Sequence, residues 1–139
     1  MMPSLQERLV TVLGEVLAVE EEPDGALTVR HNHTLASLRV VTITEGLELV
    51  SLTQVVAWDV PLTRRIRDRV TAQANTTQLG TVALVERDSE ATAKRASAKI
   101  ADVMLRYNFP GAGLSDDALR TLVLLVLDRG AEIRRALTG

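Results

Sequence analysis

The sequence predicts an α+β domain in which helices flank a five-stranded antiparallel sheet, in the order α-β-β-β-α-β-β-α. Three observations lead to this class. Apolar residues recur every three or four positions in three segments, five other segments are rich in β-branched residues or alternate between apolar and polar ones, and two connections have hairpin length. With 139 residues, 46% of them hydrophobic, the chain is long enough to fold around one core. We therefore expect a single domain over residues 1–139.

The first half of the chain predicts a helix followed by an antiparallel meander. Ser4 and Glu7 have the spacing of a capping box, and the apolar residues that follow have helical spacing. An acidic stretch from Glu20 to Gly25 supplies turn chemistry. The strands are expected at residues 26–31, 35–43 and 47–57. The short connections 31–34 and 44–46 make neighbouring strands antiparallel.

The second half predicts a helix, two strands and a terminal helix. Pro61 ends the strand section, and a helix is expected from Leu62 to Asn75, because Leu62, Ile66 and Val70 form one apolar stripe. Strands are expected at 81–87 and 101–109, separated by a charged connection from Asp88 to Ser97. Ser115 is a favourable N-cap for the terminal helix.

The terminal helix is apolar on more than one side. Leu119, Val123 and Val126 belong to a stripe that one sheet covers, whereas Leu124, Leu125 and Leu127 project outside it. Either the chain itself or a partner covers the second side. We predict a dimer or partner interface formed by four residues of this helix, namely Leu122, Leu124, Leu125 and Leu127.

Composition excludes several functional classes. Without cysteine, the chain has no thiolate nucleophile, disulfide or Cys-ligated metal, and it suits a reducing compartment. Its 16 basic and 18 acidic residues, with one Trp, one Tyr and one Phe, disfavour nucleic acid as a partner. The first eight residues are interrupted by charge and the longest apolar run, 122–127, is short. Neither a signal peptide nor a membrane span is predicted, and we expect a cytoplasmic location.

The only two histidines, His31 and His33, flank Asn32 in a predicted hairpin turn. They are a possible metal pair, but a third ligand would have to come from a distant carboxylate, so a solvated turn is favoured. A Ser-His-Asp arrangement would have to use one of the same residues. Gly111 and Gly113 lie between a strand and a helix, as in phosphate-binding loops, yet Asp116 and Asp117 would repel a phosphate. No catalytic residue, metal site or cofactor is predicted.

A basic helix face is the one concentrated positive patch, and it suits an acidic partner or a solvated surface. It consists of Arg64, Arg65, Arg67 and Arg69. The acidic stretch from Glu20 to Asp24 lacks the spaced oxygen ligands of a calcium loop. For Trp58, packing in the core or at an edge is favoured over a role as a ligand platform.

The order of elements resembles that of the YbjN family, whose fold is that of type III secretion chaperones. The resemblance is carried by a helix that ends in Ala74-Asn75-Thr76-Thr77, by Leu79-Gly80 before an apolar strand, by Val103 to Tyr107, and by the passage from Asn108 to Leu119. It implies a five-stranded sheet with flanking helices in a small bacterial regulator or chaperone-like protein, usually dimeric. It implies no catalytic residues.

These observations predict a non-enzymatic, cytoplasmic protein-interaction module. We expect a homodimer that presents apolar surface to a protein partner. The alternative is a small-molecule-binding domain with a pocket between the sheet and the helices.

Overall fold

The computed structural model describes residues 3–88 and 99–138. These residues form three helices and six strands. In chain order the elements are α1 (Leu5–Gly14), β1 (Val19–Glu21), β2 (Leu27–His31), β3 (Thr34–Thr44), β4 (Leu47–Pro61), α2 (Arg64–Thr76), β5 (Thr81–Asp88), β6 (Lys99–Phe109) and α3 (Asp116–Thr138). Beyond Asp88, the charged connection predicted up to Ser97 lies outside the described residues.

The strands form one open antiparallel sheet in the order β1-β2-β3-β4-β6-β5. β2, β3 and β4 are the predicted meander, and the hairpin register runs from His31 opposite Thr34 to Leu27 opposite Leu38. β4 is central and pairs with both β3 and β6. The predicted α+β class with an antiparallel sheet is confirmed.

The predicted strand count of five is wrong, because the described sheet has six strands. The additional strand is β1, which pairs with residues 27–29 of β2. It spans three residues that lie largely at the surface, so it has no apolar alternation that a sequence pattern would reveal. The acidic turn is correspondingly shorter than predicted, and Glu22 N–H donates to the carbonyl of Ala26 at 2.8 Å.

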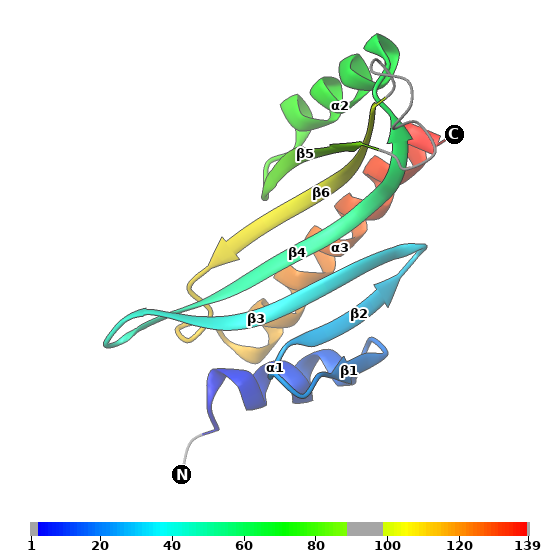
Figure 1. The fold of residues 1–139 in the computed structure, drawn as a ribbon. Coiled ribbons are helices and arrows are strands. Elements are labelled where there is room, and N and C mark those ends of the chain that lie inside the picture. The colour runs from blue at the N-terminus through cyan, green and yellow to red at the C-terminus, as the bar shows by residue number, and fades with distance from the viewer. Residues whose placement is uncertain (1–2, 89–98, 139) are drawn as a thin grey trace.

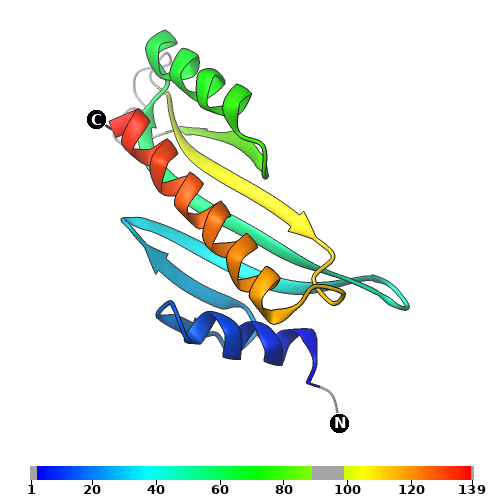
Figure 2. The same ribbon diagram turned by 180° about the vertical axis from the view of Figure 1, so that it is seen from behind.

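The helices lie on one side of the sheet. Figures 1 and 2 show α3 running across the back of β3 and β4, with α1 near one end of the sheet and α2 near the other. Both α1 and α2 contact α3. Among the described residues, the opposite face of the sheet is therefore covered by no helix, and we call it the open face.

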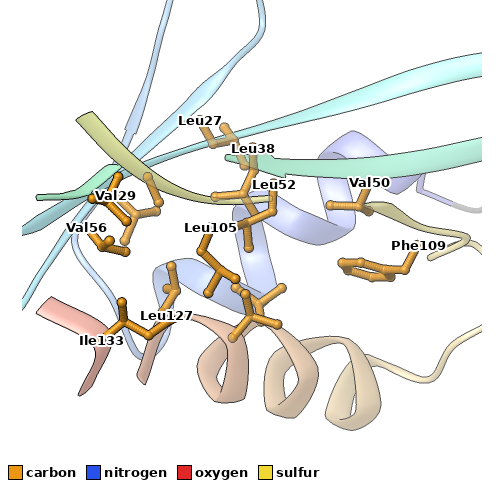
Figure 3. Packing of buried hydrophobic residues seen from close by; sticks show 14 of the residues in the cluster. Leu27, Val29, Leu38, Val50, Leu52, Val56, Leu105, Phe109, Leu127 and Ile133 are labelled. Atoms are coloured by element: carbon orange, nitrogen blue, oxygen red, sulfur yellow. The ribbon is translucent and has the colours of Figure 1, made fainter. Parts of the chain in front are cut away.

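The core fills the space between the sheet and the helices (Figure 3). Alternation decides which strand residues enter it: Val50, Leu52 and Val56 of β4 are fully buried, as are Val103 and Leu105 of β6. The residues between them point to the open face. The interior of the described chain is thus closely filled with aliphatic side chains.

The predicted caps are present. Ser4 and Glu7 form a capping box at α1, and the Ser115 hydroxyl accepts a hydrogen bond from Ala118 N–H at 3.1 Å. Thr63 caps α2 by accepting from Ile66 N–H at 3.2 Å. Each cap satisfies one of the N–H groups that a helix start leaves without an intrahelical partner.

The prediction that Leu127 faces a partner is wrong, because its side chain has no exposed surface and lies in the core. Leu122 also packs against the core. The sheet, α1 and α2 all contact α3, so the chain itself covers a wider arc of this helix than one sheet would. Leu124 is half-buried, and Leu125 is 54% exposed.

Candidate functional site

The turn between β2 and β3 has an unusual backbone. Asn32 and His33 have φ values of +46° and +68°, in the left-handed region that a type I′ hairpin turn requires at both central residues. Asparagine tolerates this region, but glycine is the usual second residue. A histidine with positive φ stores strain, and such strain concentrates at binding and catalytic sites.

Hydrogen bonds from β4 and α3 hold this turn in place. The Thr34 hydroxyl donates to the His31 carbonyl at 2.6 Å and accepts from the Gln54 side-chain amide at 2.8 Å. The same amide donates to the carbonyl of Leu127 in α3 at 3.1 Å. The His31 ring contacts Asp128 of α3, with 2.7 Å between Nε2 and Oδ1. The turn is therefore fixed to both β4 and α3.

Gln54 is a polar residue at a core position. Its side chain has no exposed surface, and its Oε1 has no hydrogen-bond partner among the described residues. A buried polar atom without a partner costs about 1–3 kcal/mol. Gln54 takes the place of an aliphatic residue in the series Val50, Leu52, Val56. Of the two hydrogen bonds that it donates, one holds Thr34 beside the turn and the other holds α3.

Trp58 lies next to this turn and not in the core, which corrects the core-packing interpretation. It is 48% exposed and sits where the β4–β6 register shifts between Ala57 and Val60. The guanidinium of Arg134 stacks over its ring, with 5.5 Å from Cζ to the ring centroid. Arg134 also donates to the Val56 carbonyl at 3.1 Å, which fixes the guanidinium in this position.

These residues line a surface groove with a volume of about 510 Å³, formed by the turn, Arg30, Leu35, Trp58 and Arg134. An adjoining groove shares Asn32, His33 and Arg134 and adds Arg135. We call the two together the turn groove. Figure 2 shows the β2–β3 turn on the same side of the molecule as the C-terminal part of α3.

The turn groove is basic. Arg30, Arg134 and Arg135 form no ion pair within the described ranges, whereas six other arginines each contact a carboxylate. Two carboxylates close to the groove have contacts of their own: Asp128 contacts the His31 ring, which is part of the groove, and Asp59 pairs with Arg87. The three arginines therefore have no ion-pair partner among the described residues.

Neither metal binding nor hydrolysis finds the groups it needs at this turn. In residues 3–88 and 99–138, no three His, Asp or Glu side chains cluster as a metal site would require. His31 and Asp128 form two members of a hydrolytic triad, but the hydrogen bonds of the described chain give the other ring nitrogen of His31 no hydroxyl partner.

The loop from Gly111 to Gly113 and the acidic turn have structural roles. A Cβ atom on Gly111 would lie 2.9 Å from Val50 Cγ2, so Gly111 packs against the core. On the outer side, Ala112 and Leu114 border a surface groove of about 640 Å³ in which Asp116 pairs with Arg8 at 3.0 Å. In the acidic turn, the hydrogen bond from Arg39 and then that from Ala26 N–H lower the pKa of Asp24. Asp24 is thus an ion-pair partner.

The predicted basic face of α2 is partly engaged. Arg67 donates to Glu86 at 2.9 Å, and Arg69 is half-buried. Arg64 and Arg65 are exposed and remain a small positive surface. None of these four residues lines the turn groove.

Sequence analysis singled out the two histidines and Trp58 but did not bring them together with Arg134. One signal was available, namely a glutamine in the buried alternation of the longest strand. A second was the Asn-His pair at a two-residue turn where Asn-Gly is usual.

No protein-family model matches the chain, and no curated protein or solved structure matches it. None of the helices in the described ranges combines the length and the apolar composition needed to span a membrane.

Proposed function

We propose that the protein is a non-enzymatic protein-interaction module that forms a homodimer through the projecting ribbon, defined as residues 39–49 of the β3–β4 hairpin. The ribbon extends past its neighbours: β2 pairs with β3 only up to Leu38, and β6 pairs with β4 only from Val50 onward. Figure 1 shows this hairpin reaching beyond the rest of the sheet. Beyond those positions, neither edge of the hairpin is paired with another described strand.

The observation that carries the proposal is the apolar surface of the ribbon. Val41, Ile43 and Leu47 are 39%, 56% and 40% exposed and make up half of the six large hydrophobic side chains exposed in the described residues. Leu49 lies directly opposite Val41, so alternation places these two side chains on the open-face side. Ile43 and Leu47 lie at the tip of the ribbon, where the register shifts between Thr42 and Thr44. A contiguous exposed apolar surface is typical of a protein–protein interface.

Charge complementarity favours a second copy as the occupant. If the two-fold axis of a dimer passes near Leu49, the tip of one ribbon, which carries Glu45 in the turn before β4, reaches the open face of the second copy around Thr53. Thr53 lies opposite Arg106, which is exposed on the open face and contacts no carboxylate in the described residues. Antiparallel packing of two ribbons thus places Glu45 beside Arg106 twice.

A stable dimer interface is larger than the ribbon, so part of the open face of the sheet must belong to it. A standard interface buries about 800 Å² per partner and about 20–30 residues a side, which is more than the ribbon alone supplies. Val55 and Met104 are half-buried further along the open face, beyond the polar residues Ser51 and Thr53. The remainder of the open face is available to a protein partner.

Other parts of the proposal have separate support. The His31 ring has no hydroxyl partner among the described hydrogen bonds, which supports a non-enzymatic role, and the lack of cysteine supports a cytoplasmic location. Membership of the YbjN family is supported by the order of elements from α2 onward. The alternative of a ligand pocket between sheet and helices gains no support, because core side chains fill that space in the described chain.

A charge exchange tests the proposal. Glu45→Arg and Arg106→Glu each place like charges together, and two-fold symmetry doubles the effect. At about 0.7 kcal/mol per exposed pair, each single variant weakens dimerisation about tenfold. The double variant restores it. The measurement is the dimer dissociation constant from light scattering over a dilution series.

The matched control is Arg65→Glu, the same charge change on the exposed surface of α2. It leaves the dissociation constant unchanged. A double variant that dissociates as readily as the two single variants contradicts the ribbon pairing.

A further inference from the structure

We propose that the turn groove is a binding site for a nucleotide, that is, a phosphate ester that carries a flat ring. This site is separate from the ribbon and does not depend on dimerisation. None of the ribbon residues lines it.

The charge of the groove fits a phosphate. Within the groove, Arg30 from β2 and Arg134 and Arg135 from α3 have no ion-pair partner among the described residues, while Asp128 contacts the His31 ring and Asp59 pairs with Arg87. A phosphate ester carries a charge of about −1.5 to −2 and accepts paired hydrogen bonds from guanidinium groups. It therefore balances the groove better than a single carboxylate does.

Arg134 is directed toward the groove and not toward the end of its own helix. Basic residues near a helix C-terminus commonly interact with the last carbonyl groups. The guanidinium of Arg134 instead bonds to Val56 of β4 and stacks on Trp58. A guanidinium that is already fixed loses little conformational entropy when an anion binds.

Trp58 provides the surface for the flat ring. It is the only tryptophan and it is 48% exposed. Arg134, which would hold the phosphate, stacks over one face of its ring, so the flat ring of the ligand would take the other face. Stacking of a base on an aromatic side chain adds to affinity without requiring a particular base. The groove volume of about 510 Å³ lies within the range of small-molecule sites, roughly 300–1,000 Å³.

The strained turn is consistent with a preorganised binding site. His33 keeps a backbone conformation that glycine would adopt more readily, and buried Gln54 leaves one oxygen unsatisfied while holding the turn. The strained backbone of His33 and the unsatisfied oxygen of Gln54 are both unfavourable, and both belong to this one turn. Such local costs are typical of sites that hold groups in position for a ligand.

The test is a titration of the whole protein with adenosine monophosphate, followed by Trp58 fluorescence and by calorimetry. We expect saturable binding that is tighter than the binding of either adenosine or inorganic phosphate. Arg30→Gln weakens it about tenfold, because one charge-assisted contact is lost. Arg65→Gln, the matched control on α2, leaves it unchanged.

A second variant separates binding from folding. His33→Gly raises the melting temperature by a few degrees, because the strain is relieved, and at the same time weakens binding of the nucleotide. Saturable binding to single-stranded oligonucleotide alone, equal affinity for adenosine monophosphate and inorganic phosphate, or no binding at millimolar concentration would each overturn the proposal.

Discussion

Gly130 of α3 lies directly against Gln54 of β4. A Cβ atom at this position would be 2.0 Å from Oε1 and 2.3 Å from Cδ of Gln54. Gln54 is fully buried and bonded to Thr34 and Leu127, so it has little room to move aside. The absence of a side chain at Gly130 therefore permits both the close packing of the helix and the hydrogen bonds that hold the turn.

Gly130→Ala is expected to lower the free energy of unfolding by about 1–3 kcal/mol, the usual effect of an added group in a filled core. The matched substitution is Gly14→Ala at the end of α1, where no atom lies within 4 Å of the added Cβ. It raises stability by about 0.4–1 kcal/mol, because alanine restricts the unfolded chain. Urea denaturation measures both, and equal effects of the two substitutions would contradict this packing.

At the scale of single elements, the turn between β1 and β2 is held by an ion pair. Arg39 of β3 donates to Asp24 Oδ2 at 2.6 Å, and Ala26 N–H donates to Oδ1 at 3.1 Å. Both bonds favour the charged carboxylate and lower the pKa of Asp24 below its ordinary 3.8. The folded state thus binds fewer protons at this group than the unfolded state does.

Because the pKa of Asp24 is lowered by folding, the contribution of this residue to folding stability depends on pH. The contribution of Asp24 is fully present above the unfolded-state pKa and is lost as pH falls through the lower folded-state value. Asp24→Asn should therefore reduce the melting temperature at neutral pH, and the difference from wild type should shrink as pH falls below 3.8. Thermal melts of both proteins over this pH range provide the check. A difference that is independent of pH would show that the charge of Asp24 does not matter.

Elements defined by local chemistry were predictable from the sequence. The alternation in β6 and the caps at Ser4 and Ser115 depend on neighbouring residues alone, and all of them are present. β1 escaped prediction because three residues carry no periodicity. The burial of Leu127 was not predictable from the sequence, because it depends on α1 and α2, which pack beside α3 from distant parts of the chain.

The candidate site is less predictable for the same reason. His31, Trp58 and Arg134 come from three segments, and only the fold brings them together. The sequence does identify the turn itself, since a two-residue connection between β-rich segments predicts a hairpin. It gives no indication that Asp128 and Gln54 hold that turn.

At the scale of the whole molecule, the arrangement is asymmetric. The helices pack on one side of the sheet, and in the described chain no helix lies on the other side (Figure 1). Val41, Ile43 and Leu47 of the projecting ribbon are exposed. A ribbon with three exposed aliphatic side chains is an aggregation hazard for a monomer unless a partner covers it. We infer that its stable state is an assembled one, and the two-fold pairing described above gives a closed dimer without a growing fibre.

The most direct measurement of this claim is sedimentation equilibrium of the full chain at increasing micromolar concentrations. We expect twice the chain mass of 15.1 kDa for the wild type and for Leu125→Glu on α3, and the mass of one chain for Ile43→Glu in the ribbon. A wild type that stays at the mass of one chain, or a dimer that Leu125→Glu separates and Ile43→Glu does not, would contradict it.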